Sequence, residues 1–126
     1  MAEKLTVQEG DQVVYCGRTR LLNEQVVSYE EFYIPRNLVP EITEKDLQGS
    51  KFEYFRNHRI ELFKTHQKIK PALPDEKLQK ILHVSANQPI LINESINYLS
   101  EEIKLEYSVV YYNPELYDFE INAYSN

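Results

Sequence analysis

Residues 17–35 read GRTRLLNEQVVSYEEFYIP, and this stretch decides the fold of the chain. Two apolar-rich runs flank a short polar break at residues 23–25, which is the pattern of a β-hairpin. Side chains alternate across a strand, so Arg18 and Arg20 project from the same face of the first strand. The sequence therefore predicts a hairpin that carries two guanidinium groups on one side.

These two arginines have two interpretations. Glu30 and Glu31 on the returning strand can neutralise them in a structural ion pair on a half-exposed sheet, which is a common arrangement. Alternatively, part of the positive charge is available to a ligand, because the planar fork of arginine suits phosphate and carboxylate groups. An anionic small molecule is then the expected ligand.

The register of the hairpin decides which glutamate faces the arginines. A two-residue loop at Asn23 and Glu24 places Glu31 on the arginine side. An odd-length loop or a β-bulge places Glu30 there instead. Both registers are compatible with the residues of the hairpin alone.

The composition is that of a single soluble globular domain. The chain has 126 residues, of which 42% are hydrophobic and 27% charged, and its mean hydropathy is -0.54. This length suffices to bury one core. No apolar run approaches the roughly 20 residues that span a bilayer, and the first residues lack the apolar core of a signal peptide. We therefore expect a cytoplasmic protein with no membrane partner.

Several kinds of site are excluded by residue counts. The net charge of -6 and a pI near 5.1 argue against nucleic-acid binding through a broad basic surface. Three glycines are too few for phosphate-cradling loops. One cysteine, Cys16, and three scattered histidines offer no metal-ligand spacing, so we expect no metal and no cofactor. Adjacent glutamates such as Glu30 and Glu31 point to opposite faces of a strand and cannot form a catalytic dyad.

The rest of the chain predicts an α+β fold with short elements. Strands are expected at residues 12–22, 25–34, 59–70, 89–99 and 103–112, with a last short strand at 117–123, and helices at 41–48, 50–58 and 75–83. Ser50 and Glu53 fit an S-x-x-E capping box. Bare backbone N–H groups make such a helix start a potential anion site, although the local sequence by itself favours an ordinary N-cap at Ser50.

A weak internal repeat relates the two halves of the chain. A shift of 77 residues places Leu5 on Leu82 and Leu22 on Leu99. Each copy reads as helix end, turn and hairpin, and the first copy has only a helix stub, so we expect the chain to begin inside the first unit. One antiparallel sheet of two related hairpins, with helices covering one face, is the simplest architecture that buries both copies.

Several motifs together resemble the UTRA effector-binding domains of HutC-type transcription regulators in the GntR superfamily. The family shows R-x-R and then E-x-x-Y-x-P in one hairpin, which matches Arg18, Arg20 and residues 30–35. A glycine-serine pair opens a short aromatic helix, as do residues 49–55 here. A later strand reads E-Y-S-x-x-x-Y, as do residues 106–112. The resemblance covers nearly the whole chain.

The resemblance implies a chorismate-lyase-like fold that binds a small effector, often a sugar phosphate or an acidic metabolite. Carried over by position, Arg18, Arg20 and Ser50 would hold the anionic group. Glu30, Glu106 and Tyr112 would meet hydroxyl groups or an amine. These residue types suit the task, because guanidinium forks and a helix start bind phosphate, and carboxylates and a phenol bind polyols.

The resemblance also implies that parts of a longer regulator are missing. Residues 1–126 would form a UTRA-like domain truncated at its N-terminus, and DNA contact would need an absent N-terminal winged helix. A homodimer is implied as well. The family commonly continues its last strand with R-G-D-R-Y, whereas residues 113–117 read NPELY here, so effector chemistry or dimer contacts can differ at that point.

Two other functions remain possible for this sequence. A lyase of the same fold that acts on an anionic aromatic acid would also use two arginines, but that likeness is one of fold alone. A pure dimerisation module would use the arginines only in ion pairs that stabilise the sheet. The hairpin motif favours a regulator, and we do not expect an enzyme.

Overall fold

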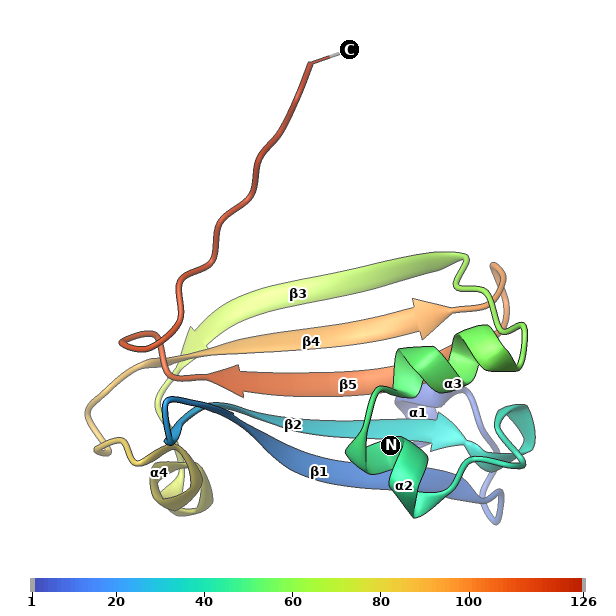
Figure 1. Cartoon of the computed structure of the whole chain (residues 1–126), viewed down its shortest axis with the longest axis horizontal. Helices are drawn as coiled ribbons and strands as arrows, with labels where there is room; N and C mark the ends of the chain where they lie inside the picture. The colour runs from blue at the N-terminus through green and yellow to red at the C-terminus, as the bar shows by residue number, and fades with distance from the viewer. Residues whose placement is uncertain (1, 126) are drawn as a thin grey trace.

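The chain folds into one antiparallel sheet with short helices around it (Figure 1). The computed structural model describes residues 2–125. The elements are α1 (Ala2–Leu5), β1 (Val13–Leu22), β2 (Gln25–Pro35), the 3-10 helix η1 (Arg36–Leu38), α2 (Glu44–Gln48), α3 (Lys51–Asn57), β3 (Lys64–Ala72), α4 (Glu76–Leu82), β4 (Ile90–Tyr98) and β5 (Lys104–Tyr112). The five strands lie in the order β1-β2-β5-β4-β3. The predicted α+β class and both hairpins are confirmed.

The first hairpin closes through a two-residue turn and contains a bulge. Asn23 and Glu24 have φ angles of 52° and 66°, which are the positive values of a type I′ turn. The register then shifts immediately after Arg20. Because of this bulge, Arg18 pairs with Glu30, so Glu30 is the glutamate that shares the arginine face.

The internal repeat is visible as a pseudo-twofold arrangement. β2 and β5, the second strands of the two hairpins, pair with each other at the centre of the sheet. Each helix that precedes a hairpin packs on the other hairpin: Leu5 of α1 contacts Tyr107 and Val109 of β5, and Leu82 of α4 contacts Tyr29 of β2. The two copies therefore bury each other's apolar helix ends.

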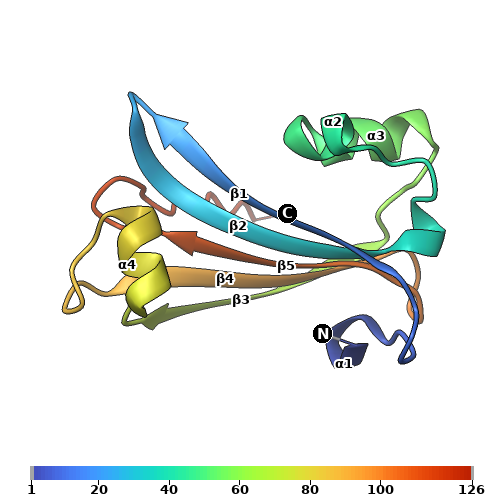
Figure 2. The same cartoon turned by 90° about the horizontal axis from the view of Figure 1, so that it is seen from below.

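Helices lie on both faces of the sheet, whereas the sequence predicted them on one. Figure 2 shows α2 and α3 over one face and α1 on the opposite side. Phe32 and Ile34 of β2 pack against Tyr54 and Phe55 of α3. Tyr29 has the opposite strand parity and packs against α4. The internal repeat explains why both faces are covered. α1 and α4 are the equivalent helices of the two copies and lie on one face, whereas α2 and α3 belong to an insertion between β2 and β3 and lie on the other face.

Two predicted strands differ from the structure. β3 begins at Lys64 and continues through Pro71 to Ala72, instead of spanning 59–70. β3 is an edge strand, and a proline can occupy an edge because no outer neighbour needs its missing N–H. Residues 117–123 form no strand, since within residues 2–125 they pair with neither edge strand of the sheet, β1 or β3. None of the helices in residues 2–125 is long and apolar enough to cross a membrane.

Candidate functional site

A cleft of about 810 Å³ lies between β1, β2, β5 and the segment that leads into α3. Five of the six predicted site residues line it: Arg18, Arg20, Glu30, Ser50 and Tyr112. Strand pairing brings them together, since Ser28 of β2 lies opposite Arg20 on one side and Tyr112 on the other. The sixth residue, Glu106, is not part of the cleft wall.

Arg18 is held by bonds within the protein. Its Nε donates to Oε1 of Glu30 at 3.0 Å, and its Nη1 donates to the backbone oxygens of Leu47 at 3.1 Å and Gly49 at 2.8 Å. Its guanidinium group also lies 5.3 Å from the centre of the Phe32 ring. Arg18 therefore ties β1 to the end of α2 and fixes one wall of the cleft.

Arg20 has a different environment from Arg18. Its side chain is exposed. Within residues 2–125 it forms no ion pair and no side-chain hydrogen bond. Since both arginines project from the same face of β1 into the same cleft, the cleft contains one guanidinium group that is engaged and one that is available.

Lys51 is a component of the site that sequence reasoning missed. Its Nζ lies 3.1 Å from Oε2 of Glu30 and 2.5 Å from Oε2 of Glu106, and it sits 3.9 Å from the centre of the Phe32 ring. Its side chain is only 2% exposed. One signal could have indicated it, because a lysine at the first position of a helix opposes the helix dipole and so suggests a carboxylate partner.

Glu106 lies beneath the cleft, fully buried. Its Oε1 accepts a hydrogen bond from Nδ2 of Asn97 at 2.6 Å. Its Oε2 makes the ion pair with Lys51 but no hydrogen bond of regular geometry among the described residues. Burial raises the pKa of Glu106, and the neighbouring Lys51 charge works in the opposite direction. Glu106 is therefore connected to the cleft through Lys51 and then Glu30, which lines the cleft wall.

Ser50 and Tyr112 contribute hydroxyl groups to the cleft wall. Oγ of Ser50 accepts from the backbone N–H of Glu53 at 3.3 Å, which is one half of the predicted capping box. Tyr112 packs against the rings of Tyr117 and Phe119, with ring centres 4.8 and 4.7 Å away. Burial raises the pKa of Tyr112, so its hydroxyl stays protonated near neutral pH and can donate a hydrogen bond.

Other chemistries find little support in this part of the molecule. No group of three His, Cys, Asp or Glu side chains in the described range 2–125 is placed to hold a metal ion. Cys16 lies on the same face as Arg18, and burial raises the pKa of its thiol, which keeps it protonated. A protonated thiol is a weak nucleophile, so Cys16 is best described as a packing residue.

The sequence matches known proteins along most of its length. The regulator GgaR of Escherichia coli K12 is 28% identical over 120 residues, which cover 94% of this chain and 47% of that protein. The mannosyl-D-glycerate transport/metabolism system repressor MngR of Escherichia coli K12 is 27% identical over 124 residues, which cover 98% of this chain and 52% of that protein. The chain thus spans about half the length of these curated relatives.

Solved structures show the same fold. The possible regulator YydK of Bacillus subtilis superposes with a TM-score of 0.89 at 26% identity, covering 98% of this chain and 56% of that one. The effector-binding domain of the Bacillus subtilis trehalose repressor TreR superposes with a TM-score of 0.87 at 15% identity, covering 99% and 88%. These relatives are transcription regulators and not enzymes, which disfavours the lyase alternative. The UTRA domain family matches residues 1–118, and the chain therefore belongs to the UTRA domain family.

Proposed function

We propose that this chain is the effector-binding domain of a bacterial transcription regulator of the GntR family and that its cleft binds a small anionic metabolite, such as a sugar phosphate. The whole regulator would be a cytoplasmic homodimer that contacts DNA through a winged helix outside this chain. The observation that carries the proposal is the exposed, unengaged guanidinium group of Arg20 inside the cleft.

Charge balance explains why Arg20 is the principal anion contact. The cations Arg18 and Lys51 and the anions Glu30 and Glu106 form one connected cluster, in which the charges cancel when all four groups are ionised. Arg20 adds a positive charge that this cluster does not neutralise. An anion in the cleft would supply the missing partner, and the planar guanidinium fork can bind phosphate or carboxylate through two parallel hydrogen bonds.

The remaining cleft residues favour a ligand with hydroxyl groups. Tyr112 and Ser50 offer hydroxyls, and the glutamate Glu30 accepts hydrogen bonds. Relatives support the same class of ligand. MngR is named for mannosyl-D-glycerate, a sugar joined to a carboxylic acid, and TreR is named for the sugar trehalose. A sugar that carries a phosphate or a carboxylate fits both the anionic and the polyol contacts.

Signalling would follow from a shift between conformations. An effector that binds one arrangement of the domain more tightly than another increases the population of that arrangement. In a homodimer, the changed arrangement would alter the spacing of the two winged helices and hence the affinity for an operator.

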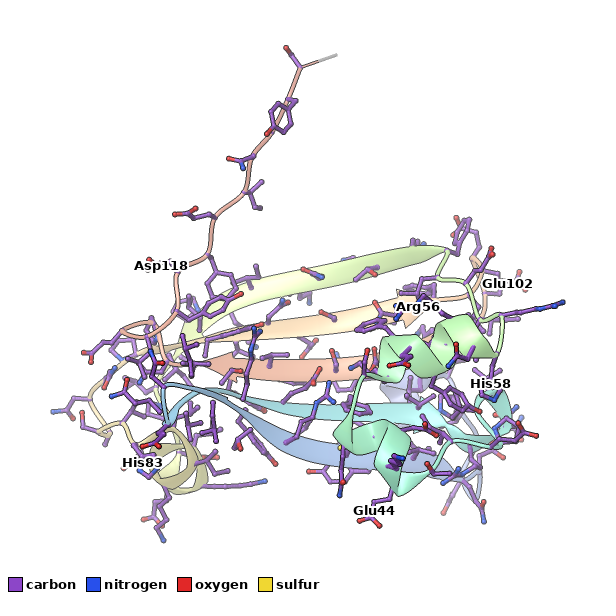
Figure 3. All side chains as sticks on the ribbon, viewed as in Figure 1. Glu44, Arg56, His58, His83, Glu102 and Asp118 are labelled. Atoms are coloured by element: carbon purple, nitrogen blue, oxygen red, sulfur yellow. The ribbon has the colours of Figure 1, made fainter. Side chains whose placement is uncertain are left out.

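Thermal unfolding with three probes tests the proposal. A hexose 6-phosphate, the neutral hexose and inorganic phosphate are compared, because a ligand that binds only the folded state stabilises it by about 2.7 kcal/mol at 100 times its Kd. We expect the largest shift with the sugar phosphate. Arg20→Ala should abolish that shift, whereas Arg56→Ala, at an exposed position of α3 that is labelled in Figure 3 and does not line the cleft, should preserve it.

Two results would contradict the proposal. The first is an absence of any shift with phosphorylated and carboxylated sugars. The second is a shift of unchanged size in Arg20→Ala, which would move the anion site away from this cleft.

A further inference from the structure

Lys51 places an ammonium group where the amino group of a ligand could bind. Its Nζ lies 3.1 Å from Oε2 of Glu30, 2.5 Å from Oε2 of Glu106 and 3.9 Å from the centre of the Phe32 ring. Carboxylates and the face of an aromatic ring are the groups with which proteins bind an ammonium ion. These three side chains therefore form an ammonium subsite, and the chain fills it with its own lysine.

The ammonium subsite borders the cleft. Glu30 belongs to both, because its side chain lines the cleft wall and also contacts Nζ of Lys51. Ser50, which precedes Lys51 in the sequence, lines the same wall. Only the carboxylate of Glu30, whose side chain is 18% exposed, links the lysine to the cleft. A ligand that contacts Glu30 from the cleft is thus a direct neighbour of the ammonium group.

The two carboxylates of the subsite are already engaged on both oxygens. Oε1 of Glu30 accepts from Nε of Arg18 at 3.0 Å, and Oε1 of Glu106 accepts from Nδ2 of Asn97 at 2.6 Å. The Oε2 atom of each faces Nζ of Lys51. Glu30 is the only acidic residue among the described residues that line the cleft. The negative charge that an incoming amine would need is therefore balanced by cations of the chain itself.

An amino group and a hydroxyl group of a ligand would meet this arrangement differently. A ligand ammonium beside Glu30 would lie close to the charges of Lys51 and Arg18, and like charges repel strongly in a partly buried site. A ligand hydroxyl stays neutral and can donate a hydrogen bond to Glu30 without that repulsion. The charges around Glu30 therefore favour a hydroxyl group over an ammonium group.

We propose that Lys51 is a specificity-determining residue of the cleft and that it makes the cleft select anionic sugars with a hydroxyl group near Glu30 over those with a free amino group there. Lys51 does so by occupying the ammonium subsite itself, which leaves no counter-charge for the wrong ligand. This inference rests on the proposed function for the class of effector, whereas the ammonium subsite can be tested without any sugar.

Calorimetry with glucose 6-phosphate and glucosamine 6-phosphate compares one hydroxyl group with one amino group on the same sugar phosphate. In mildly acidic buffer, where the amine is protonated, we expect the wild type to bind glucose 6-phosphate about tenfold more tightly or better. Lys51→Ala should lose or reverse this preference, because the two glutamates then lack their lysine. Equal affinities of the wild type for the two sugars would overturn the proposal.

Lys64→Ala is the matched control for these titrations. Lys64 also pairs with a glutamate, Glu101, at 3.0 Å, but its side chain is 44% exposed and does not line the cleft. The control should therefore keep the wild-type preference for glucose 6-phosphate. A loss of preference in Lys64→Ala equal to that in Lys51→Ala would mean that the effect is one of overall charge, and would overturn the assignment to Lys51.

A small amine tests the ammonium subsite without a sugar. n-Propylammonium contains the atoms that Lys51→Ala removes beyond Cβ. It should raise the unfolding temperature of Lys51→Ala, or restore folding if the variant is unfolded alone, more than sodium chloride or propan-1-ol does. The wild type and Lys64→Ala should respond to it as they respond to sodium chloride. Equal responses of Lys51→Ala to the three additives would overturn the ammonium subsite.

The two proposals fail separately in these experiments. Rescue of Lys51→Ala by n-propylammonium, without binding of any phosphorylated or carboxylated sugar by the wild type, supports the ammonium subsite and contradicts the proposed effector site. Equal binding of both sugar phosphates that is lost in Arg20→Ala supports the effector site and contradicts the role of Lys51. Preference for glucose 6-phosphate together with rescue by the amine supports both proposals.

Discussion

Nζ of Lys51 and Oε2 of Glu106 lie 2.5 Å apart in the interior of the protein, with side chains that are 2% and 1% exposed. The pair joins the first turn of α3 to the centre of β5, and Glu30 extends it to the cleft. A buried ion pair of this kind is costly to break, because removing one partner leaves the other charge uncompensated. Lys51 is therefore the residue through which the core and the cleft are connected.

Lys51→Met should reduce the free energy of unfolding by about 3–5 kcal/mol near neutral pH, as measured by urea denaturation. The double variant Lys51→Met/Glu106→Gln should recover part of that loss, since no uncompensated carboxylate remains. Burial raises the pKa of Glu106 above its ordinary value of 4.5. The penalty in Lys51→Met is thus present above the folded pKa and should shrink as the pH falls toward 4.5. A loss that grows on acidification would contradict this assignment.

Arg18→Ala and Arg20→Ala should have opposite effects on stability and on binding. Arg18 makes three hydrogen bonds within the protein, so its loss should cost about 2 kcal/mol of unfolding free energy. Arg20 makes none among the described residues, and its loss should change stability by less than about 0.5 kcal/mol. Chemical denaturation of both variants checks the contrast. Equal destabilisation would mean that Arg20 is also structural.

Glu24→Gly should stabilise the first hairpin. Glu24 has a φ of 66°, which costs a residue with a side chain more than it costs glycine. The substitution creates the Asn-Gly pair that type I′ turns prefer. We expect about 1 kcal/mol of additional unfolding free energy, measured by thermal or urea denaturation. Glu24→Ala is the matched control and should bring no gain, because alanine retains the Cβ atom.

Acid should loosen the start of α2 through Asp46. The Thr43 backbone N–H and then its hydroxyl lower the pKa of Asp46 below the ordinary value of 3.8, at donor distances of 2.9 and 3.0 Å. A lowered folded pKa means that the stabilisation is present above pH 3.8 and is lost as the pH falls through the folded value. Carboxyl NMR titration should show a higher Asp46 pKa in Thr43→Ala than in Thr43→Ser.

The sequence predicted the hairpins and most helices well because their signals are local. Apolar-rich runs on either side of a short polar break mark the hairpin of β1 and β2. Thr43, Ser50 and Asp75 are N-caps that place the helix starts within a few residues. The end of β3 was misplaced at Pro71, because an edge position is a property of the sheet and not of the residue. The strand expected at 117–123 is absent from the sheet of residues 2–125, because alternation marks a segment that can pair but does not say whether an edge strand will pair with it.

The candidate site was likewise predictable from the sequence in part. The residue types and the spacing of Arg18 and Arg20 already predicted a polar cluster on one strand face. Which arginine is engaged could not be predicted, because two of the three acceptors of Arg18 are backbone oxygens of Leu47 and Gly49, far along the chain. Those carbonyls carry no sequence signal, since every residue has one.

By itself, the sequence determined the antiparallel hairpins, the helix caps and the family resemblance, since these depend on patterns over a few neighbouring residues. Only the tertiary structure decided that Glu30 shares the face of Arg18 and that Lys51 bridges Glu30 and Glu106. The reason is physical. A single bulge after Arg20 reverses which side chains face the cleft, and a buried charge is tolerated only where distant strands and a helix bring its counter-charges into contact.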